Sequence, residues 1–316
     1  ININIADFDA HKHSALPLVA DAKVCLEELI QLLKGHEVEE EYKAKVYHFN
    51  KSWDAKVEEI YHLNHPGISQ GEVIGRVNEL SDPESIMICA AGSMPGDLHK
   101  AWRARHPKNF HLEYGYSCMG YEIAGGLGAK MAAPEREVYV MVGDGSYLML
   151  AQEIITSIQE EMKLIIVLIN NHGFASIGGL SRSLGSEGFG TRYLYRDQNE
   201  NTIGGDELSR EKAQSQYLPV DLAKNAESLG AIVLKADSIE AFESCLQAAK
   251  KTDRTTVVYV ETDRYQGMEG YCWWEVPVAE VSKNEKVEKA YQEYSSQKEK
   301  QRYYLKPPID SDSWAD

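Results

Sequence analysis

The segment "VYVMVGDGSYLMLAQEI", Val138–Ile154, decides the fold class of this chain. An apolar, mostly β-branched run stops at Gly143-Asp144-Gly145, and a helix-like pattern follows a few residues later. Such a run predicts a buried strand of a parallel sheet. Asp144 then has two interpretations. It is either part of a tight turn, where Asp and Gly are common, or a cation ligand at the carboxyl end of a strand, where open α/β sheets bind their ligands.

The next predicted strand helps to choose between these interpretations. It lies in "KLIIVLINNHGF", Lys163–Phe174, and ends in Asn170-Asn171, one strand–helix–strand crossover after Asp144. Because both strands of such a unit end at the same edge of the sheet, the two side chains should meet there. The oxygens of Asp144 and Asn171, with the carbonyl of Gly173, would supply about half of an octahedral Mg²⁺ shell. Two ordinary turn clusters remain the alternative.

Composition narrows the class of protein. The 316 residues, with 43% apolar content, allow a large core, and no run approaches the ~18 apolar residues of a membrane helix. A net charge of −16 argues against nucleic acid or an anionic membrane as partner. The five cysteines are scattered without a Cys-x-x-Cys pair, and no leader-like segment opens the chain, so a cytoplasmic location is expected.

Strands alternate with helices from about residue 85 to 263, which is typical of a doubly wound parallel sheet. The pattern predicts a strand over Ser85–Ala90 and one crossover helix over Tyr147–Met162. "ININI" at the start indicates a buried strand, and because a strand needs ladder partners, we expect further chain upstream. The expected divisions are the end of a middle α/β domain (1–35, with a helix ending at Gly35), a helical linker (36–80), the main sheet domain (81–282) and a C-terminal helix and tail (283–316).

Gly-Asp-Gly and Asn-Asn at this spacing resemble the thiamine diphosphate (ThDP) enzyme superfamily. The resemblance implies an α/β diphosphate-binding fold of the type called PP, with ThDP and Mg²⁺ as cofactors. It makes Asp144, Asn171 and Gly173 the metal ligands. It places further cofactor contacts in "AAGSMPG" (Ala90–Gly96), in "SCMGYEIAGGLG" (Ser117–Gly128) and around the two metal segments. The candidates are Gly92, Ser93, Met119, Gly143, Gly145, Ser146 and Asn170. For Met119, the alternative is a role as a gap-filling core residue. For Asn170, the alternative is a role in a turn.

Five longer segments are similar to one family within that superfamily, the trihydroxycyclohexanedione hydrolases of myo-inositol catabolism. They are "CAAGSMPGDLHKAWR", "HLEYGYSCMGYEIAGGLGAK", "VMVGDGSYLML", "SRSLGSEGFGT" and "GYCWWEVPVAEVS". The resemblance implies hydrolytic cleavage of a ring carbon–carbon bond in a cyclic polyol-dione, which gives 5-deoxyglucuronate. The alternatives are an acetolactate synthase-like carboligase or decarboxylase, and a non-catalytic subunit of ThDP-enzyme fold.

The superfamily activates its cofactor with a glutamate from a second α/β domain, of the type called Pyr. Too few residues precede the predicted metal domain to form one. The resemblance therefore implies an activating glutamate upstream of Ile1 or on another chain, and a homodimer or homotetramer. We expect the 316 residues alone to bind Mg²⁺ weakly and to turn over nothing. His172, Glu113 and Phe174 are guesses for groups near the pocket, with a turn or packing role as the alternative for each.

Overall fold

A computed structural model of the chain describes residues 1–13, 15–186, 188, 190–195, 217–269 and 275–301. The tail 302–316 and the Cys-Trp-Trp part of Gly270–Ser282 lie outside the described residues. The chain forms two compact units, one of Ile1–Lys51 with Gln292–Asp316 and the other of Ser52–Tyr291. The domain boundaries expected from the sequence stay a prediction.

The larger unit contains a six-stranded sheet in the order β4-β3-β5-β6-β8-β7. Every neighbouring pair is parallel, which confirms the predicted fold class. The strands are β3 (Ile86–Cys89), β4 (Phe110–Leu112), β5 (Val138–Gly143), β6 (Ile165–Asn170), β7 (Ile232–Ala236) and β8 (Thr256–Glu261).

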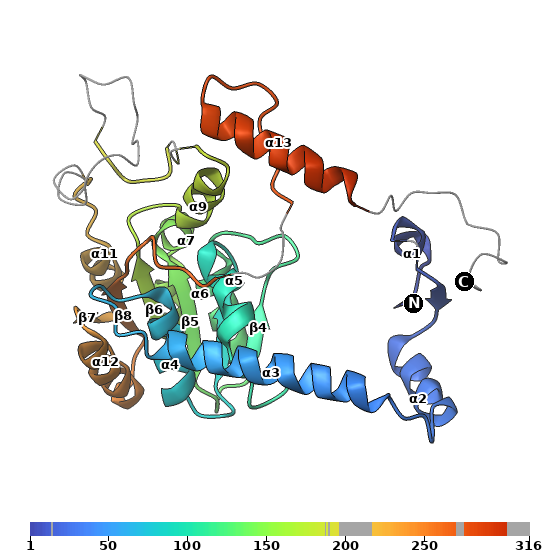
Figure 1. Cartoon of the computed structure of the whole chain (residues 1–316). Coiled ribbons are helices and arrows are strands. Elements are labelled where there is room, and N and C mark those ends of the chain that lie inside the picture. Colours follow the sequence, from blue (N-terminus) through green and yellow to red (C-terminus); the bar gives the residue numbers. More distant parts are fainter. Residues whose placement is uncertain (14, 187, 189, 196–216, 270–274, 302–316) are drawn as a thin grey trace. The chain divides into compact units, whose positions relative to one another are not determined.

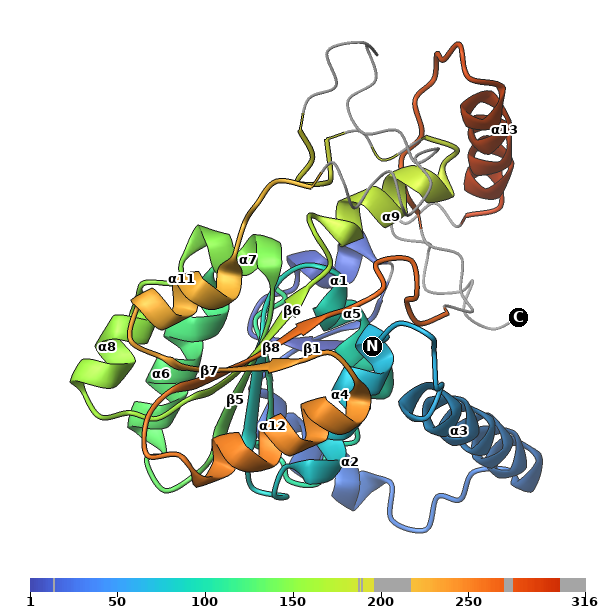
Figure 2. The ribbon, with the colours of Figure 1, turned by 90° about the vertical axis from the view of Figure 1, so that its left-hand side faces the viewer.

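Helices cover both faces of this sheet, as Figures 1 and 2 show. The long helix α3 (Glu40–Tyr61) crosses the boundary between the units, and α13 (Glu285–Glu299) does so at the other end of the chain. The helices within the larger unit are α4 (Gln70–Leu80), α5 (Ser93–Ala101), α6 (Tyr121–Ala132), α7 (Asp144–Met149), α8 (Glu153–Gln159), α9 (Ala175–Ser183), α11 (Leu222–Ser228) and α12 (Ile239–Lys251).

The strand sequences explain why both faces are covered. Alternate side chains of a strand point to opposite faces. In β5, Tyr139 and Met141 enter one core with α4, α5, α12 and the end of α3. Val138, Val140 and Val142 enter the other core with α6, α8 and α11. A strand that is apolar at every position therefore belongs in the middle of such a sheet.

Several predicted elements need correction. The strand predicted over Ser85–Ala90 is the shorter β3, and the single crossover helix predicted over Tyr147–Met162 is two helices, α7 and α8. The helix breaks at Leu150, whose ψ is 80°, where a Cβ on Gly120 would lie 2.8 Å from the Leu150 Cβ. This close loop contact is a tertiary feature that helical periodicity does not contain. The short elements β4 and α9 were not predicted.

The smaller unit holds α1 (Phe8–Lys12), α2 (Ala22–Leu32) and a parallel pair, β1 (Asn2–Asn4) with β2 (Pro17–Val19). The predicted first strand is present as β1, but its residues are half-buried and not fully buried, and Ile1 and Ile5 on either side of it are 78% and 82% exposed. The helix predicted to end at Gly35 ends at Leu32. Two strands alone offer no second layer to cover the isoleucines.

The order of the strands fixes where a ligand site belongs. From β3 the chain moves outward to β4, whereas from β5 it moves the other way, to β6. The crevice between the carboxyl ends of β3 and β5 is therefore a topological switch point, where open α/β sheets bind their ligands. Within the part of the chain that the structure describes, no helix combines the length and apolar character needed to cross a membrane.

Candidate functional site

A cavity of about 320 Å³ opens at this switch point. Its walls come from the segments that follow β3, β5 and β6, together with the loop before α6. Most of the sequence-predicted site residues line it. They are Gly92, Ser93, Met119, Gly143, Asp144, Gly145, Ser146, Asn171, Gly173 and Phe174.

Asp144 lies at the bottom of this cavity and is 1% exposed. Its Oδ1 accepts a hydrogen bond from the Gly145 amide at 2.7 Å. Its Oδ2 accepts from the amides of Asn171 at 3.2 Å and Gly173 at 2.9 Å, so the carboxylate joins the tips of β5 and β6. Burial raises the pKa of Asp144, and the three amides oppose that shift. A carboxylate buried with only backbone donors around it is suited to a cation.

Asn171 supplies the second predicted metal oxygen. Asn171 is 8% exposed, and its buried side-chain Oδ1 has no hydrogen-bond partner among the residues that the structure describes. A buried polar atom without a partner costs about 1–3 kcal/mol, so native proteins rarely keep one without a function. The orphaned oxygen lies in the same cavity as the Asp144 carboxylate. The residues present therefore fit a hard divalent cation such as Mg²⁺.

The turn after β6 presents this oxygen through unusual backbone geometry. His172 has φ of 59° and Gly173 has φ of 142°, both in the left-handed region. A Cβ on Gly173 would lie 2.2 Å from the Thr191 carbonyl oxygen, so only glycine fits there. The Gly173 carbonyl, the third predicted ligand, accepts a hydrogen bond from the Ala175 amide at 3.1 Å. Carbonyl oxygens have a second lone pair, so its role as a metal ligand stays a prediction.

Gly145, Phe174 and Met119 form one wall of the cavity. A Cβ on Gly145 would lie 2.9 Å from the Phe174 ring and 3.4 Å from the Met119 Cε. The side chain of Met119 remains 40% exposed. Met119 therefore reaches over the Gly-Asp-Gly turn toward the cavity instead of filling the core.

A buried hydrogen-bond network under the cavity was not predicted. The Glu122 carboxylate, on α6, accepts from the Ser146 hydroxyl at 2.7 and 2.8 Å and from the Ala91 amide at 3.1 Å. The Ser146 oxygen in turn accepts from the Gly120 amide at 2.8 Å. Burial raises the pKa of Glu122. Ser146 thus ties the loops after β3 and before α6 to α7, and its hydroxyl already has partners within the protein.

The structure does not bring three of the predicted residues to the cavity. Asn170 donates to the Tyr259 hydroxyl at 2.8 Å and accepts from the His172 amide, which favours the turn alternative. The His172 ring stacks on Tyr217 and lies 3.4 Å from a Glu261 oxygen. The Glu113 carboxylate is exposed and accepts from the amides of Tyr116 and Cys118, so it stabilises its own loop.

Gln70 is a cavity residue that no motif or spacing predicted. It is the first residue of α4 and is 6% exposed. Its amide donates to the buried Asp97 carboxylate at 2.7 Å, and its Oε1 accepts from the Ser93 hydroxyl at 3.2 Å. Gln70 follows the helix cap Ser69. Helix-start signals explain the cap but not the side chain that points into a cavity.

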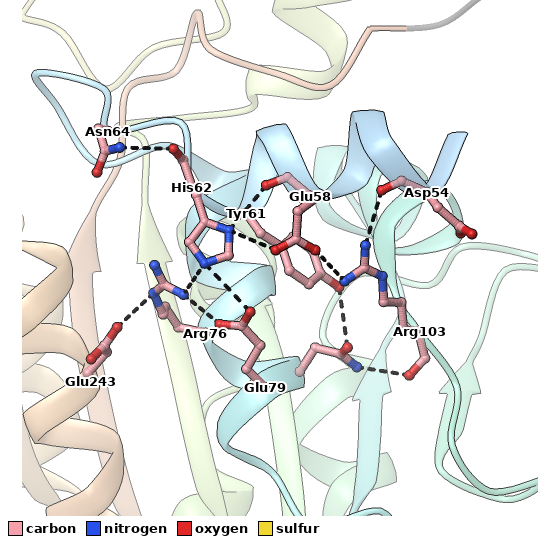
Figure 3. Close-up of polar contacts among 10 residues, drawn as sticks. Asp54, Glu58, Tyr61, His62, Asn64, Arg76, Glu79, Arg103 and Glu243 are labelled. Atoms are coloured by element: carbon pink, nitrogen blue, oxygen red, sulfur yellow. Dashed lines mark hydrogen bonds and ion pairs between the residues drawn. The ribbon is translucent and has the colours of Figure 1, made fainter. Parts of the chain in front are cut away.

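A second group of possible metal ligands is exposed and consists of Glu58, His62 and Glu79. Figure 3 shows the polar contacts of these residues. Two arginines already occupy this group. Arg103 donates to Glu58 at 2.9 Å, and Arg76 contacts Glu79 and lies 3.2 Å from a His62 ring nitrogen. Because guanidinium groups satisfy these carboxylates, the cluster is an ion-pair network that joins α3 to α4.

A known protein family matches the part of the chain that forms most of the cavity. Residues 90–260 match the model of the thiamine pyrophosphate enzyme family, in its C-terminal TPP binding domain. This segment includes both Gly-Asp-Gly and Asn-Asn. The chain belongs to the thiamine pyrophosphate enzymes. The family's domain binds the same cofactor that the sequence resemblance implied.

Individual relatives of this family are similar along most of the chain. A 3D-(3,5/4)-trihydroxycyclohexane-1,2-dione hydrolase 2 of Bacillus cereus (strain ZK / E33L) is 36% identical over 330 aligned positions. The protein called 3D-(3,5/4)-trihydroxycyclohexane-1,2-dione hydrolase in Bacillus thuringiensis (strain Al Hakam) is 36% identical as well. Both alignments cover 96% of this chain and 50% of the relative. The chain therefore spans about half the length of the curated relatives it matches.

Proposed function

We propose that this chain is the cofactor-binding part of a ThDP- and Mg²⁺-dependent hydrolase of myo-inositol degradation. Its substrate is 3D-(3,5/4)-trihydroxycyclohexane-1,2-dione, and its product is 5-deoxy-D-glucuronate. The observation that carries the cofactor assignment is the buried Asp144 carboxylate beside the orphaned Asn171 oxygen, at the switch point of a TPP-binding domain. The names of the similar Bacillus proteins support the choice of substrate.

Within this proposal, the described residues bind and orient the cofactor. Asp144 and Asn171, with the Gly173 carbonyl, would hold Mg²⁺, which would offset the negative charge of the diphosphate. Gly92 has φ of 97° and precedes α5, so its loop can bring backbone amides close to phosphate oxygens. Met119, in the wall that it forms with Gly145 and Phe174, would support the cofactor ring. When bound, the cofactor supplies the nucleophilic carbon that makes cleavage next to a carbonyl possible.

A partner domain is also part of the proposal. Three apolar side chains that line the cavity stay exposed in the described structure: Tyr114 by 42%, Met119 by 40% and Ile177 by 59%. Exposed apolar groups around a cavity mouth are typical of a surface that another domain covers. We infer that a Pyr-type domain covers these side chains. The upstream part of the protein would form this domain, and the protein would assemble as a homodimer or homotetramer. That domain would carry the activating glutamate. A cytoplasmic location stays a prediction.

The test is an assay of the intact protein with the inositol-derived dione. Ring cleavage is measured by mass spectrometry of the acid product. We expect it only when both ThDP and Mg²⁺ are present. A matched control omits each in turn after dialysis against EDTA. Pyruvate is tested in parallel as a substrate. Formation of acetolactate from pyruvate, without cleavage of the dione, would show that the protein is a carboligase and not the proposed hydrolase.

A further inference from the structure

A second cavity, of about 280 Å³, adjoins the cofactor cavity. The two share wall residues, among them Gln70, Ser93 and Asn171. The wall of the second cavity continues with Arg182 of α9 and with Arg264, which follows β8. Two guanidinium groups therefore lie along one continuous surface with the predicted metal ligand Asn171.

The two arginines converge on a single point of α9. A Cβ placed on Gly178 would lie 3.3 Å from Nη1 of Arg182 and 3.3 Å from Nη2 of Arg264. The same Cβ would lie 2.7 Å from the Thr191 hydroxyl. Any other residue at this position would displace the arginines. Both guanidinium groups therefore border the same side of α9, and their positive charges favour an anion as the ligand of this cavity.

No carboxylate of the described chain pairs with Arg264, whose guanidinium carbon lies 5.9 Å from the centre of the Tyr265 ring. Its Nη atoms lie 3.5 Å from the carbonyls of His172 and Thr191, at the limit of hydrogen bonding. Its Nε is buried without a partner. Asp97 and Asp263 line the same cavity, but no ion pair among the described residues includes Arg264. Burial, followed by the neighbouring Arg192, lowers the pKa of Arg264, as expected for a cation without a counter-ion.

We propose that Arg264, with Arg182 beside it, binds the terminal phosphate of the cofactor's diphosphate. The inference rests on the proposed function, because it assumes that ThDP and Mg²⁺ occupy the first cavity. A divalent ion neutralises only part of the charge of a diphosphate, and a guanidinium is well matched to the remaining phosphate oxygens. The N-terminus of α9, whose first residues Ala175 and Ser176 line both cavities, adds backbone amides to the same site.

The test measures binding of magnesium pyrophosphate, the diphosphate without the organic part of the cofactor, by isothermal titration calorimetry. We expect Arg264→Gln to weaken binding about tenfold or more, since charge-assisted hydrogen bonds contribute ~1.5–3 kcal/mol. Arg264→Lys should recover part of the loss. The matched control is Arg254→Gln, which removes an equal charge from an exposed site at the opposite edge of the sheet. Arg182→Gln is the second variant, and circular dichroism verifies the fold of each.

The outcomes separate this inference from the proposed function. If the wild-type protein does not bind magnesium pyrophosphate, the proposed cofactor site itself fails. If the wild type binds and both Arg264→Gln and Arg182→Gln bind equally well, only the arginine assignment is overturned. Unchanged pyrophosphate binding with a raised KM for the dione would overturn it too, and would assign the arginines to the substrate. If Arg264→Gln and Arg254→Gln lose similar amounts of pyrophosphate affinity, the loss reflects only the net charge of the protein, and the arginine assignment is overturned.

Discussion

Two regions of the larger unit gather carboxylates, and they differ in what the carboxylates contact. In the surface network of Figure 3, Glu58 and Glu79 are paired with arginines and are more than one third exposed. In the cavity at the carboxyl edge, Asp144 is 1% exposed and, within the described chain, accepts hydrogen bonds only from backbone amides. The Asn171 side-chain oxygen in the same cavity has no partner among the described residues.

The difference shows which arrangement stabilises the fold and which serves a ligand. Exposed ion pairs gain little because water solvates their charges well. A buried carboxylate without a cation is costly, and a protein keeps it when a ligand offsets the cost. Counting possible ligand atoms would place a metal at Glu58, His62 and Glu79. The balance of burial and hydrogen bonding instead favours Asp144 and Asn171, the metal ligands that we propose.

The largest expected effect comes from removing the buried charge. Asp144→Asn keeps the shape of the side chain but removes the anionic ligand, so Mg²⁺-dependent ThDP binding should weaken by at least about 100-fold. Calorimetry with ThDP measures it, and Glu79→Gln serves as the control from the surface network. Equal ThDP binding by Asp144→Asn and the wild type would contradict the assignment of the metal to the cavity and not to the surface network.

The next effect concerns the backbone that holds the site. Gly173→Ala should destabilise the protein by about 2 kcal/mol, because the new Cβ meets the Thr191 carbonyl at 2.2 Å. At Gly92, which also has positive φ, a Cβ meets nothing within 4 Å, so Gly92→Ala should cost only the conformational strain of about 1 kcal/mol. Urea unfolding of the two variants measures the difference. Equal destabilisation would show that the 170–174 turn is able to move.

A smaller effect tests the carboxylate under the cavity. The pKa of Glu122 is raised in the folded state, so its contribution to stability falls as the pH rises from its unfolded pKa through the folded one. Glu122→Gln stays neutral and can still bond to Ser146 and Ala91. As the pH rises from 4 to 8, the free energy of unfolding of the variant should therefore increase by about 1 kcal/mol relative to that of the wild type. Urea unfolding without cofactor gives the curves. A constant difference across this range contradicts the shift.

The smallest effect belongs to the surface network. Glu79→Gln should change the free energy of unfolding by about 0.5 kcal/mol or less, because its partner Arg76 keeps an ion pair with Glu243 at 2.7 Å. The difference should shrink further in high salt, which screens exposed charges. A loss of several kcal/mol that persists in high salt would mean that this network, too, is more than an exposed set of ion pairs.

The fold was readable from the sequence because its central strands are apolar at every position. Val138–Val142 and Ile165–Ile169 have no polar face, and only a sheet covered on both sides accommodates them. Period and turn residues then placed the loops after β5 and β6 at one edge. The break of the crossover helix at Leu150 was beyond such reasoning, because Leu150 packs closely against Gly120, which is distant in the sequence.

The candidate site was readable only in part, for a similar reason. Asp144 and Asn171 are marked by glycines and by the distance between two strand ends, which are local signals. Gln70 lines the cavity, Glu122 lies under it and Arg264 lines the adjoining cavity because helices and loops pack in a particular way. Their sequence neighbourhoods resemble any helix or strand end. His172 and Glu113 show the reverse, since chemically suitable residues next to a motif point elsewhere.

The most direct test of the central claim is a crystal structure of the protein soaked with ThDP and Mn²⁺, with anomalous diffraction data at the manganese edge. The account predicts one strong anomalous peak bonded to the Asp144 carboxylate and to the Asn171 side-chain oxygen, next to the diphosphate. A peak at Glu58, His62 and Glu79 with no peak at Asp144 would contradict it.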